Sequence, residues 1–522
     1  MRFVVLNNHC REVAVKITKI EVDRMNVILD IIQNQTLTYE QKVLAMAREA
    51  ENSIDVLSIS DAVQELRDQG IVCDLFEGNA PYRPRYIVPD YDLFMKQGSK
   101  FLSLDPPEDL DDALNNLMIL YRHVPSITSF PVYIGNLDRL LNPFIEDEDY
   151  ALKAIKRLLK YIDRTITDSF CHANIGPEDT LAGRLILKAE RELQNSIPNL
   201  TMKVSEETPD AFINEGVQTA LVTAKPSFAH HERFAEEFKA GDYGIVSCYN
   251  GLFIGGGAHT LVRMNLMKLA EKSQGLEDFL TKELPQAVDL MLSYLDERVR
   301  FVVEDSTFFE SNFLVREGLL HKDRFTSMFG MVGLAETVNH FLATDDPSSH
   351  FGHNTKADDL GVQIIETIEA LVKGHKDNPY LAVSEGKYLL HAQVGIDSDL
   401  SSSPGCRIPI GEEPPIHDHL LQAGRFHKYF PSGIGDIFKF DEMSKKNPAQ
   451  VTDIVRGAFK AGLRYFSAYA ADADVIRITG YLVKRSEMEK LDRGEQVLRD
   501  TVALGLGSVK NQKVLERAKR DM

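Results

Sequence analysis

The chain has 522 residues, 43% of them apolar, with 33 Gly and 21 Pro, so it can bury a large core and is long enough for several structural units. Its 59 Lys and Arg against 78 Asp and Glu give a formal net charge of −19, which disfavours binding to the phosphates of nucleic acids. Because no apolar run reaches about 18 residues and the first residues lack the apolar segment of a signal peptide, we expect a soluble cytoplasmic protein with no membrane span.

The first expected unit, residues 1–100, is mainly helical. Apolar residues recur at helical spacing through 39–69, and Gly70 supplies a plausible C-terminal stop for the second helix. The two prolines in 80–85 make that segment a connector, because proline interrupts helices.

The second expected unit, residues 101–440, alternates strands with helices, which is typical of an α/β architecture with a largely parallel sheet. The pattern predicts strands at 130–135, 200–204, 221–224 and 243–246, and helices at 148–168, 180–197, 209–220 and 232–240. Beyond residue 256 it predicts helices at 259–272, 284–304, 331–343 and 357–374, short strands at 380–384 and 388–394, and a loop-rich stretch at 398–437.

The third expected unit, residues 441–522, closes the chain. Its pattern predicts a helix at 448–465, an apolar hairpin at 475–483 and a helix at 486–503.

The cysteines are scattered along the chain, at Cys10, Cys73, Cys171, Cys248 and Cys406. No two of them have the C-x-x-C spacing of a local zinc or iron–sulfur site, so we expect no bound metal and no tightly bound cofactor. Sparse, unpaired thiols in a long chain are typical of a reducing compartment.

The apolar hairpin carries the motif Arg-x-x-Gly-Tyr, formed by Arg477, Gly480 and Tyr481. Taken alone, it could be an edge strand weakened by one glycine. It also resembles the signature of the glycyl radical enzymes, in which a glycine Cα stores an unpaired electron. Such a radical is delocalised into both flanking peptide groups when Cα is planar, which suits the one residue without a Cβ. The resemblance implies a glycyl radical at Gly480, with Arg477 and Tyr481 as supporting residues.

Residues 243–248, Tyr-Gly-Ile-Val-Ser-Cys, look like the cysteine loop of the same family. Taken alone, Cys248 could be a small apolar residue at the end of a buried strand. The resemblance implies an α/β barrel of two half-barrel sheets surrounded by helices, with the cysteine loop and the glycine loop meeting inside. There the Gly480 radical would take the thiol hydrogen of Cys248 and leave a thiyl radical facing the substrate.

Two further stretches, 255–266 and 325–336, look similar to segments of the anaerobic ribonucleotide reductases of this superfamily. The chain lacks their C-x-x-C zinc motifs and any recognisable nucleotide-sensing cone. It also has Asn250 where the dehydratases and lyases have a glutamate base, and Ser247 where formate-lyase relatives have a second cysteine. Length and motifs best match the short YjjI-type branch of glycyl radical proteins.

Other polar residues are weaker candidates. Asn250, His259 and Glu336 lie in or beside the family-like stretches and could act as acid–base or substrate-binding groups. The glycines at 255–257 lack the neighbours of a P-loop or a dinucleotide fingerprint, so we expect close backbone packing there instead. The two histidines in 417–419 have no third ligand nearby, and we expect them to face solvent.

The resemblance implies a radical enzyme whose reaction, of the lyase, dehydratase or related rearrangement type, is unassigned. A ribonucleotide reductase-like enzyme and a non-catalytic, barrel-shaped binding or scaffold protein remain alternatives. Because the chain lacks the three-cysteine cluster that splits S-adenosylmethionine, the implied partner is a separate radical-SAM activating enzyme, beside a small-molecule substrate. We expect no nucleic-acid or membrane partner, and the sequence leaves a homodimer open.

Overall fold

The computed structural model describes residues 26–74, 82–126, 130–238, 242–343, 346–393 and 402–512. Several expectations fall outside these ranges, namely the start of the chain with Cys10, the first part of the connector at 80–85, the end of the helix predicted at 232–240, the start of the loop at 398–437, and residues 513–522. In the ranges described, no helix is both long and apolar enough to cross a membrane.

The described residues form two five-stranded sheets, which confirms the expected α/β barrel class with two half-barrel sheets. The first sheet joins β1 (Val72–Cys73), β8 (Gly256–Asn265), β9 (Phe325–Val332) and β10 (Leu389–Ala392) in that order, and β2 (Tyr86–Val88) also pairs with β8. The second sheet has the order β11 (Asp436–Phe440), β12 (Tyr465–Ala470), β5 (Ser227–His230), β4 (Asn199–Val204) and β3 (His172–Ile175). Neighbours run parallel within β8–β9–β10, β3–β4–β5 and β11–β12, while β12 and β5 are antiparallel.

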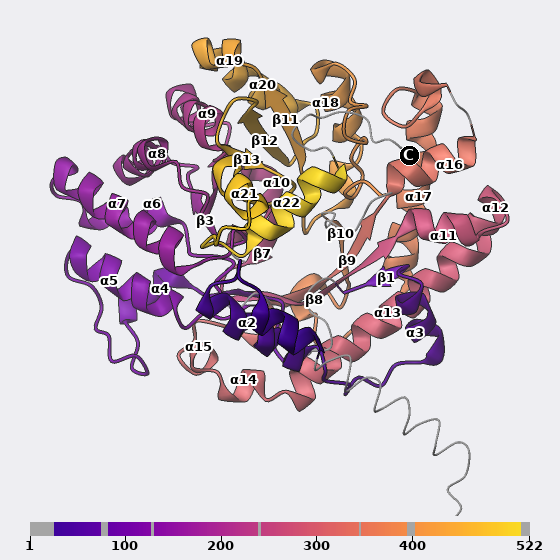
Figure 1. Cartoon of the computed structure of the whole chain (residues 1–522), viewed down its shortest axis with the longest axis horizontal. Helices are drawn as coiled ribbons and strands as arrows, with labels where there is room; N and C mark the ends of the chain where they lie inside the picture. Colours follow the sequence, from indigo (N-terminus) through magenta and orange to yellow (C-terminus); the bar gives the residue numbers. More distant parts are fainter. Residues whose placement is uncertain are drawn as a thin grey trace, which may run out of the picture.

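Helices cover the outer sides of both sheets (Figure 1). On one side lie α5 (Leu110–Tyr121), α7 (Glu148–Thr165), α8 (Leu181–Leu193), α9 (Asp210–Thr223) and α20 (Pro448–Lys460); on the other lie α11 (Leu266–Lys272), α13 (Leu284–Arg300), α16 (Leu334–Leu342) and α17 (Thr355–Gly374). The helix predicted at 148–168 is confirmed as α7, which begins after the N-cap Asp147 and buries one apolar face. Gly70, with a positive φ of 66°, ends the second N-terminal helix as expected.

The described residues form further helices and strands. They are α2 (Tyr39–Glu51), α3 (Asp61–Asp68), α4 (Tyr91–Gln97), α6 (Leu137–Leu141), α10 (His231–Glu237), β6 (Tyr243–Val246), β7 (Asn250–Phe253), α12 (Leu276–Asp278), α14 (Phe308–Ser311), α15 (Phe313–Arg316), α18 (Ile416–Gly424), α19 (Glu442–Lys446), β13 (Val475–Arg477), β14 (Leu482–Lys484), α21 (Arg485–Asp492) and α22 (Thr501–Gln512). The hairpin predicted at 475–483 is confirmed by β13 and β14.

Several predicted elements are wrong. The segment 221–224 continues helix α9, and the strand follows at β5, because a short apolar run does not distinguish helix from strand. The first part of the helix predicted at 259–272 is β8, which is buried on both faces and so lacks the alternation of a half-buried strand. The strand predicted at 380–384 is a 3₁₀ turn, and the loop-rich stretch at 398–437 contains α18.

Two further predictions differ from the structure at the edges of elements. Residues 130–135 belong to no sheet, although the N–H of Ile134 donates to the His172 carbonyl and the Val132 carbonyl accepts from Ser247. The helix predicted at 486–503 is divided into α21 and α22 by a turn in which Gly494 has a φ of 81°. The division of the chain at residues 100 and 440 stays a prediction.

Candidate functional site

The cysteine loop is the tip of the β6–β7 hairpin. Val246 and Asn250 pair across the hairpin, and Ser247 takes a left-handed φ of 57° that turns the chain towards Cys248. The backbone N–H of Ser247 donates to Val132, and its carbonyl oxygen lies 2.9 Å from Nδ1 of His172. The carbonyl oxygen of Cys248 accepts a hydrogen bond of 2.8 Å from the Tyr465 hydroxyl. All three backbone groups are therefore held from outside the loop.

The glycine loop connects β13 to β14 and brings Gly480 against Cys248. A Cβ placed on Gly480 would lie 2.1 Å from Sγ of Cys248 and 2.3 Å from its Cβ, far inside van der Waals contact. Since a carbon–carbon bond is about 1.5 Å long, the Cα of Gly480 lies within about 3.6 Å of that sulfur. The two predicted residues, far apart in the sequence, are thus in direct contact, and only glycine fits at position 480.

Arg477 and Asn199 hold the glycine loop in place. The buried guanidinium of Arg477 donates to Asn199 Oδ1 at 3.1 Å, to the Ala224 carbonyl at 2.9 Å and to the Gly480 carbonyl at 3.4 Å. Asn199 in turn donates from Nδ2 to the Gly480 carbonyl at 3.0 Å. The carbonyl beside the proposed radical carbon therefore accepts two hydrogen bonds. Tyr481 is buried, and its ring centroid lies 5.4 Å from that of Phe170.

The Cys248 thiol is buried, with 5% of the residue exposed, and burial raises its pKa to about 11. Ser247, whose hydroxyl lies 3.7 Å from the sulfur, and the nearby arginines offset part of that rise. The thiol therefore keeps its hydrogen at neutral pH. This suits hydrogen-atom transfer, which needs an S–H bond, and does not suit nucleophilic chemistry, which needs a thiolate.

Next to the thiol lies a cluster of ring and cationic side chains. The Tyr249 hydroxyl donates to the Ala392 carbonyl at 2.7 Å, and its ring stacks on His391 with 5.7 Å between centroids. The Arg407 guanidinium lies 5.8 Å from the centroid of the same tyrosine ring and donates from Nε to the Gly435 carbonyl at 2.6 Å. Burial lowers the pKa of His391 to about 3, so its imidazole is neutral.

Of the three weaker candidates, Asn250 lies nearest to the cysteine. It is 1% exposed on β7, donates from Nδ2 to the Val246 carbonyl at 3.1 Å, and buries its Oδ1 without a hydrogen-bond partner in the described part of the chain. His259 bonds the Thr326 carbonyl through Nδ1 at 3.0 Å. Glu336, in the first turn of α16, accepts from the Ser403 hydroxyl at 2.6 Å. These two hydrogen bonds do not reach the Cys248–Gly480 pair, and the roles of all three candidates stay predictions.

The expectation that both histidines of 417–419 face solvent is wrong for His419. Its residue is 6% exposed, and Nε2 lies 3.5 Å from the carboxylate of Asp436, which His427 also contacts at 3.1 Å. The reason is that this segment is helix α18, whose buried face carries His419, rather than a loop. No three His, Cys, Asp or Glu side chains among the described residues are grouped so as to hold a metal ion.

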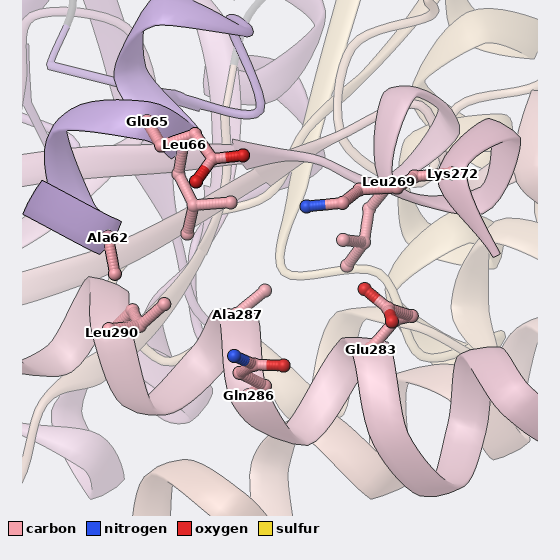
Figure 2. Close-up of a pocket in the computed structure, with 9 residues that line it drawn as sticks. All are labelled: Ala62, Glu65, Leu66, Leu269, Lys272, Glu283, Gln286, Ala287 and Leu290. Carbon is pink, nitrogen blue, oxygen red and sulfur yellow. The ribbon is translucent and has the colours of Figure 1, made fainter.

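A separate pocket of about 60 Å³ lies on the outer helices (Figure 2). It is lined by residues of α3, α11 and α13 with Glu283 just before α13, and the lining side chains include Glu65, Leu269, Lys272 and Gln286. It contains no residue of the cysteine or glycine loop and is distinct from the site described above.

Sequence comparison extends over nearly the whole chain. Residues 37–520 match the family model described as "Glycyl radical enzyme YjjI-like". The chain is 44% identical over 501 residues to a Haemophilus influenzae protein named "Uncharacterized protein", covering 95% of this chain and 97% of that protein. It is 42% identical over 493 residues to the Escherichia coli "Uncharacterized protein YjjI", covering 94% of this chain and 95% of the other.

Solved structures share the fold at low sequence identity. An anaerobic ribonucleotide reductase from Thermotoga maritima matches with a TM-score of 0.67 at 12% identity, covering 92% of this chain and 94% of that one. A hydroxyproline dehydratase from Clostridioides difficile, solved with trans-4-hydroxy-L-proline bound, matches with a TM-score of 0.62 at 12% identity, covering 92% and 88%. Both likenesses concern the barrel and leave the reaction open.

Proposed function

Since the chain belongs to the YjjI-like family of glycyl radical enzymes, we propose that Gly480 is the residue that stores its radical and that Cys248 passes this radical to a substrate. The observation that carries the proposal is the contact between the two residues, with the Gly480 Cα within about 3.6 Å of the Cys248 sulfur. At that separation a hydrogen atom can move directly from one to the other.

The proposed cycle begins with the Gly480 radical. Its Cα takes the hydrogen atom from the Cys248 S–H bond, which restores a closed-shell glycine and leaves a thiyl radical. The thiyl radical takes a hydrogen atom from a substrate C–H bond and becomes a thiol again. After the substrate radical has rearranged or fragmented, the product radical takes this hydrogen back from the Cys248 thiol. The thiyl radical formed in this way then takes a hydrogen from the Gly480 Cα, so the radical returns to Gly480. The protein supplies the burial that excludes water and oxygen from these steps.

We propose that the substrate is a small molecule and that the reaction is a radical cleavage or elimination of the lyase or dehydratase type. An elimination needs a proton acceptor. Asn250 stands two residues after the cysteine, and an amide cannot accept that proton as a carboxylate does. A dehydratase reaction would therefore use a base from another element.

We propose that a separate radical-SAM activating enzyme generates the radical. Gly480 is buried, so an activating enzyme cannot reach its Cα while the glycine loop is docked. We propose that β13, β14 and the following helices move out together during activation and return afterwards. Oxygen-sensitive chemistry and unpaired cysteines fit a reducing, oxygen-poor cytoplasm.

The test is anaerobic incubation with an activating enzyme, followed by EPR spectroscopy and exposure to air. The wild-type protein should give an organic-radical doublet and should then be cleaved at Gly480 in air. Gly480→Ala should give neither, and Cys248→Ala should give the doublet without turnover. Because the alanine at 480 would clash with the sulfur, the double variant with Cys248→Ala controls for misfolding. A Gly480→Ala protein that still gives the doublet would contradict the proposal.

A further inference from the structure

Arginine side chains from separate parts of the chain gather around Cys248. Arg407 lies against the ring of Tyr249, the residue that follows the cysteine. Arg85, just before β2, and Arg407 are, with Arg477, the charged groups that act most strongly on the Cys248 thiol. All three are cationic.

A fourth arginine joins this group through the first sheet. Arg263 on β8 pairs with Gly330 on β9, which pairs with His391 on β10. Directly paired residues place their side chains on the same face of a sheet, and a Cβ on Gly330 would lie 3.1 Å from that of Arg263. Arg263 therefore shares the sheet face of His391, whose ring stacks on Tyr249.

Arg407 offers N–H groups that have no acceptor in the described part of the chain. Its Nε donates to the Gly435 carbonyl and its guanidinium lies over Tyr249, but it forms no ion pair there. Arg477, by contrast, is occupied by Asn199, Ala224 and the glycine loop. A half-buried guanidinium with N–H groups to spare is well suited to bind an anion.

Two buried polar atoms flank the reacting pair and also lack partners among the described residues. They are Oδ1 of Asn250, two residues after Cys248, and Oγ1 of Thr479, directly before Gly480. Buried polar atoms of this kind are uncommon in folded proteins and call for a bound group that satisfies them. A polar ligand next to Cys248 and Gly480 would do so.

We propose that the substrate carries an anionic group, a carboxylate or a phosphate, which the guanidinium of Arg407 binds next to Cys248. The proposal rests on the function proposed above and names its substrate class. The bond from Nε to Gly435 and the contact with Tyr249 hold the guanidinium in place, so that its remaining N–H groups can bind two oxygens of one anion. The charge of Arg85, which also acts on the Cys248 thiol, adds to this positive potential and disfavours cationic substrates.

The experiment measures anion binding to the full-length enzyme before activation, so that no radical is needed. Thermal shifts are recorded with inorganic phosphate, with malonate and with choline, at constant ionic strength set with chloride. We expect phosphate or malonate to raise the melting temperature in a saturable way and choline to leave it unchanged. A larger effect of one anion identifies the group as phosphate or carboxylate, and no saturable effect of either would overturn the proposal.

Variants then locate the site. Arg407→Gln should weaken the apparent affinity for the effective anion by about tenfold or more, since it removes a charge-assisted bidentate contact. Arg407→Lys keeps the charge but loses the planar fork, and we expect an intermediate loss. The matched control is Arg493→Gln, which replaces an exposed arginine paired with Glu495. We expect this variant to bind the anion like wild type. Unchanged binding by Arg407→Gln would overturn the proposal.

Failure of this inference can be told apart from failure of the proposed function. A protein that gives the EPR doublet and is cleaved in air, but does not bind phosphate or malonate through Arg407, keeps its radical chemistry and has another substrate class. If the protein binds the anion through Arg407 but gives no doublet, the proposed function is wrong and the anion site remains supported. If Arg407→Gln fails to fold, Arg407→Lys supplies the comparison.

Discussion

At Gly480 the place of a side chain is occupied by the sulfur of Cys248. Asn199 connects this glycine to Arg477, because its side chain donates to the Gly480 carbonyl and accepts from the Arg477 guanidinium. Hydrogen bonds to that carbonyl favour spin delocalisation onto its oxygen and also fix the loop. We therefore predict that Asn199 prolongs the lifetime of the radical proposed at Gly480.

Asn199→Ala tests this role. We expect the EPR doublet to form but to decay several-fold faster under anaerobic conditions, because the carbonyl loses one donor and the buried Arg477 loses an acceptor. Asn199→Asp keeps the acceptor and should leave the guanidinium bound while still removing the donor. The radical lifetimes are compared at temperatures equally far below the melting temperature of each protein. Equal lifetimes in wild type and Asn199→Ala would rule the role out.

The burial of Cys248 predicts a response to alkaline pH. Its pKa is raised from 9.0 to about 11 by burial, so the folded state holds the thiol proton more tightly than the unfolded state does. The resulting stability is fully present below about pH 9 and is lost as the pH rises towards 11. Urea unfolding at pH 8 and at pH 10.5 should show a smaller loss of stability in Cys248→Ala than in wild type. An identical loss in both proteins would show that this thiol ionises as easily as an exposed one.

At the scale of elements, the hairpin and helices of the C-terminal region are attached to the barrel by a buried ion pair. Arg499, between α21 and α22, contacts the carboxylate of Asp163 on α7, which is fully buried, and also Glu487 on α21. Two residues before Arg499, the carbonyl of Val497 accepts a hydrogen bond of 3.1 Å from Nε2 of Gln41 on α2. Docking of the glycine loop thus depends on two elements outside the loop.

Arg499→Ala should loosen this attachment. It removes the buried cation from the Asp163 carboxylate and leaves the exposed Arg164 as its ion-pair partner, a change that we expect to destabilise by about 1–3 kcal/mol. We expect faster hydrogen exchange across 475–484 and a lower urea midpoint. Arg493→Ala, which breaks an exposed pair with Glu495, should change stability by less than about 1 kcal/mol. Exchange in 475–484 as slow as in wild type would mean that other contacts hold the loop.

The sequence identifies the reacting residues better than it identifies the strands around them. The proposed glycyl radical requires glycine at position 480, and the proposed hydrogen transfer requires a thiol at position 248. Both residues can therefore be recognised from their local motifs in a single sequence. Asn199 does not, because its role depends on a contact across 281 positions of the chain and on no local motif. The pattern does not predict the strands β5, β9, β11 and β12, since they are buried on nearly all positions and show no alternation.

At the scale of the whole molecule, the proposed activation requires the glycine loop to leave the barrel, and the proposed catalysis requires it to return. Gln41 of α2 donates to the carbonyl of Val497 between α21 and α22, so segments distant in sequence meet at the C-terminal region (Figure 1). Under this proposal the two sheets and their covering helices keep their places, and only the C-terminal region moves.

Hydrogen exchange with and without the activating enzyme tests this separate movement. In the free protein, 475–484 should be protected, because the hairpin is paired and buried. With the activating enzyme bound, exchange should rise there, while β4 and β9 stay as slow as before. Protection of 475–484 as strong as that of β4 in the complex would contradict movement of the loop, and increased exchange in both sheets would point to unfolding of the barrel instead.

The direction from which the sulfur approaches Gly480 also determines stereochemistry. The sulfur stands where an L-amino acid carries its side chain, and in glycine that position belongs to the pro-S hydrogen. A hydrogen delivered by Cys248 to the planar radical therefore enters from this side alone. If the radical is quenched without oxygen in deuterated water, with Cys248 delivering the last hydrogen, the glycine recovered from position 480 should be chiral, with its deuterium in the pro-S position.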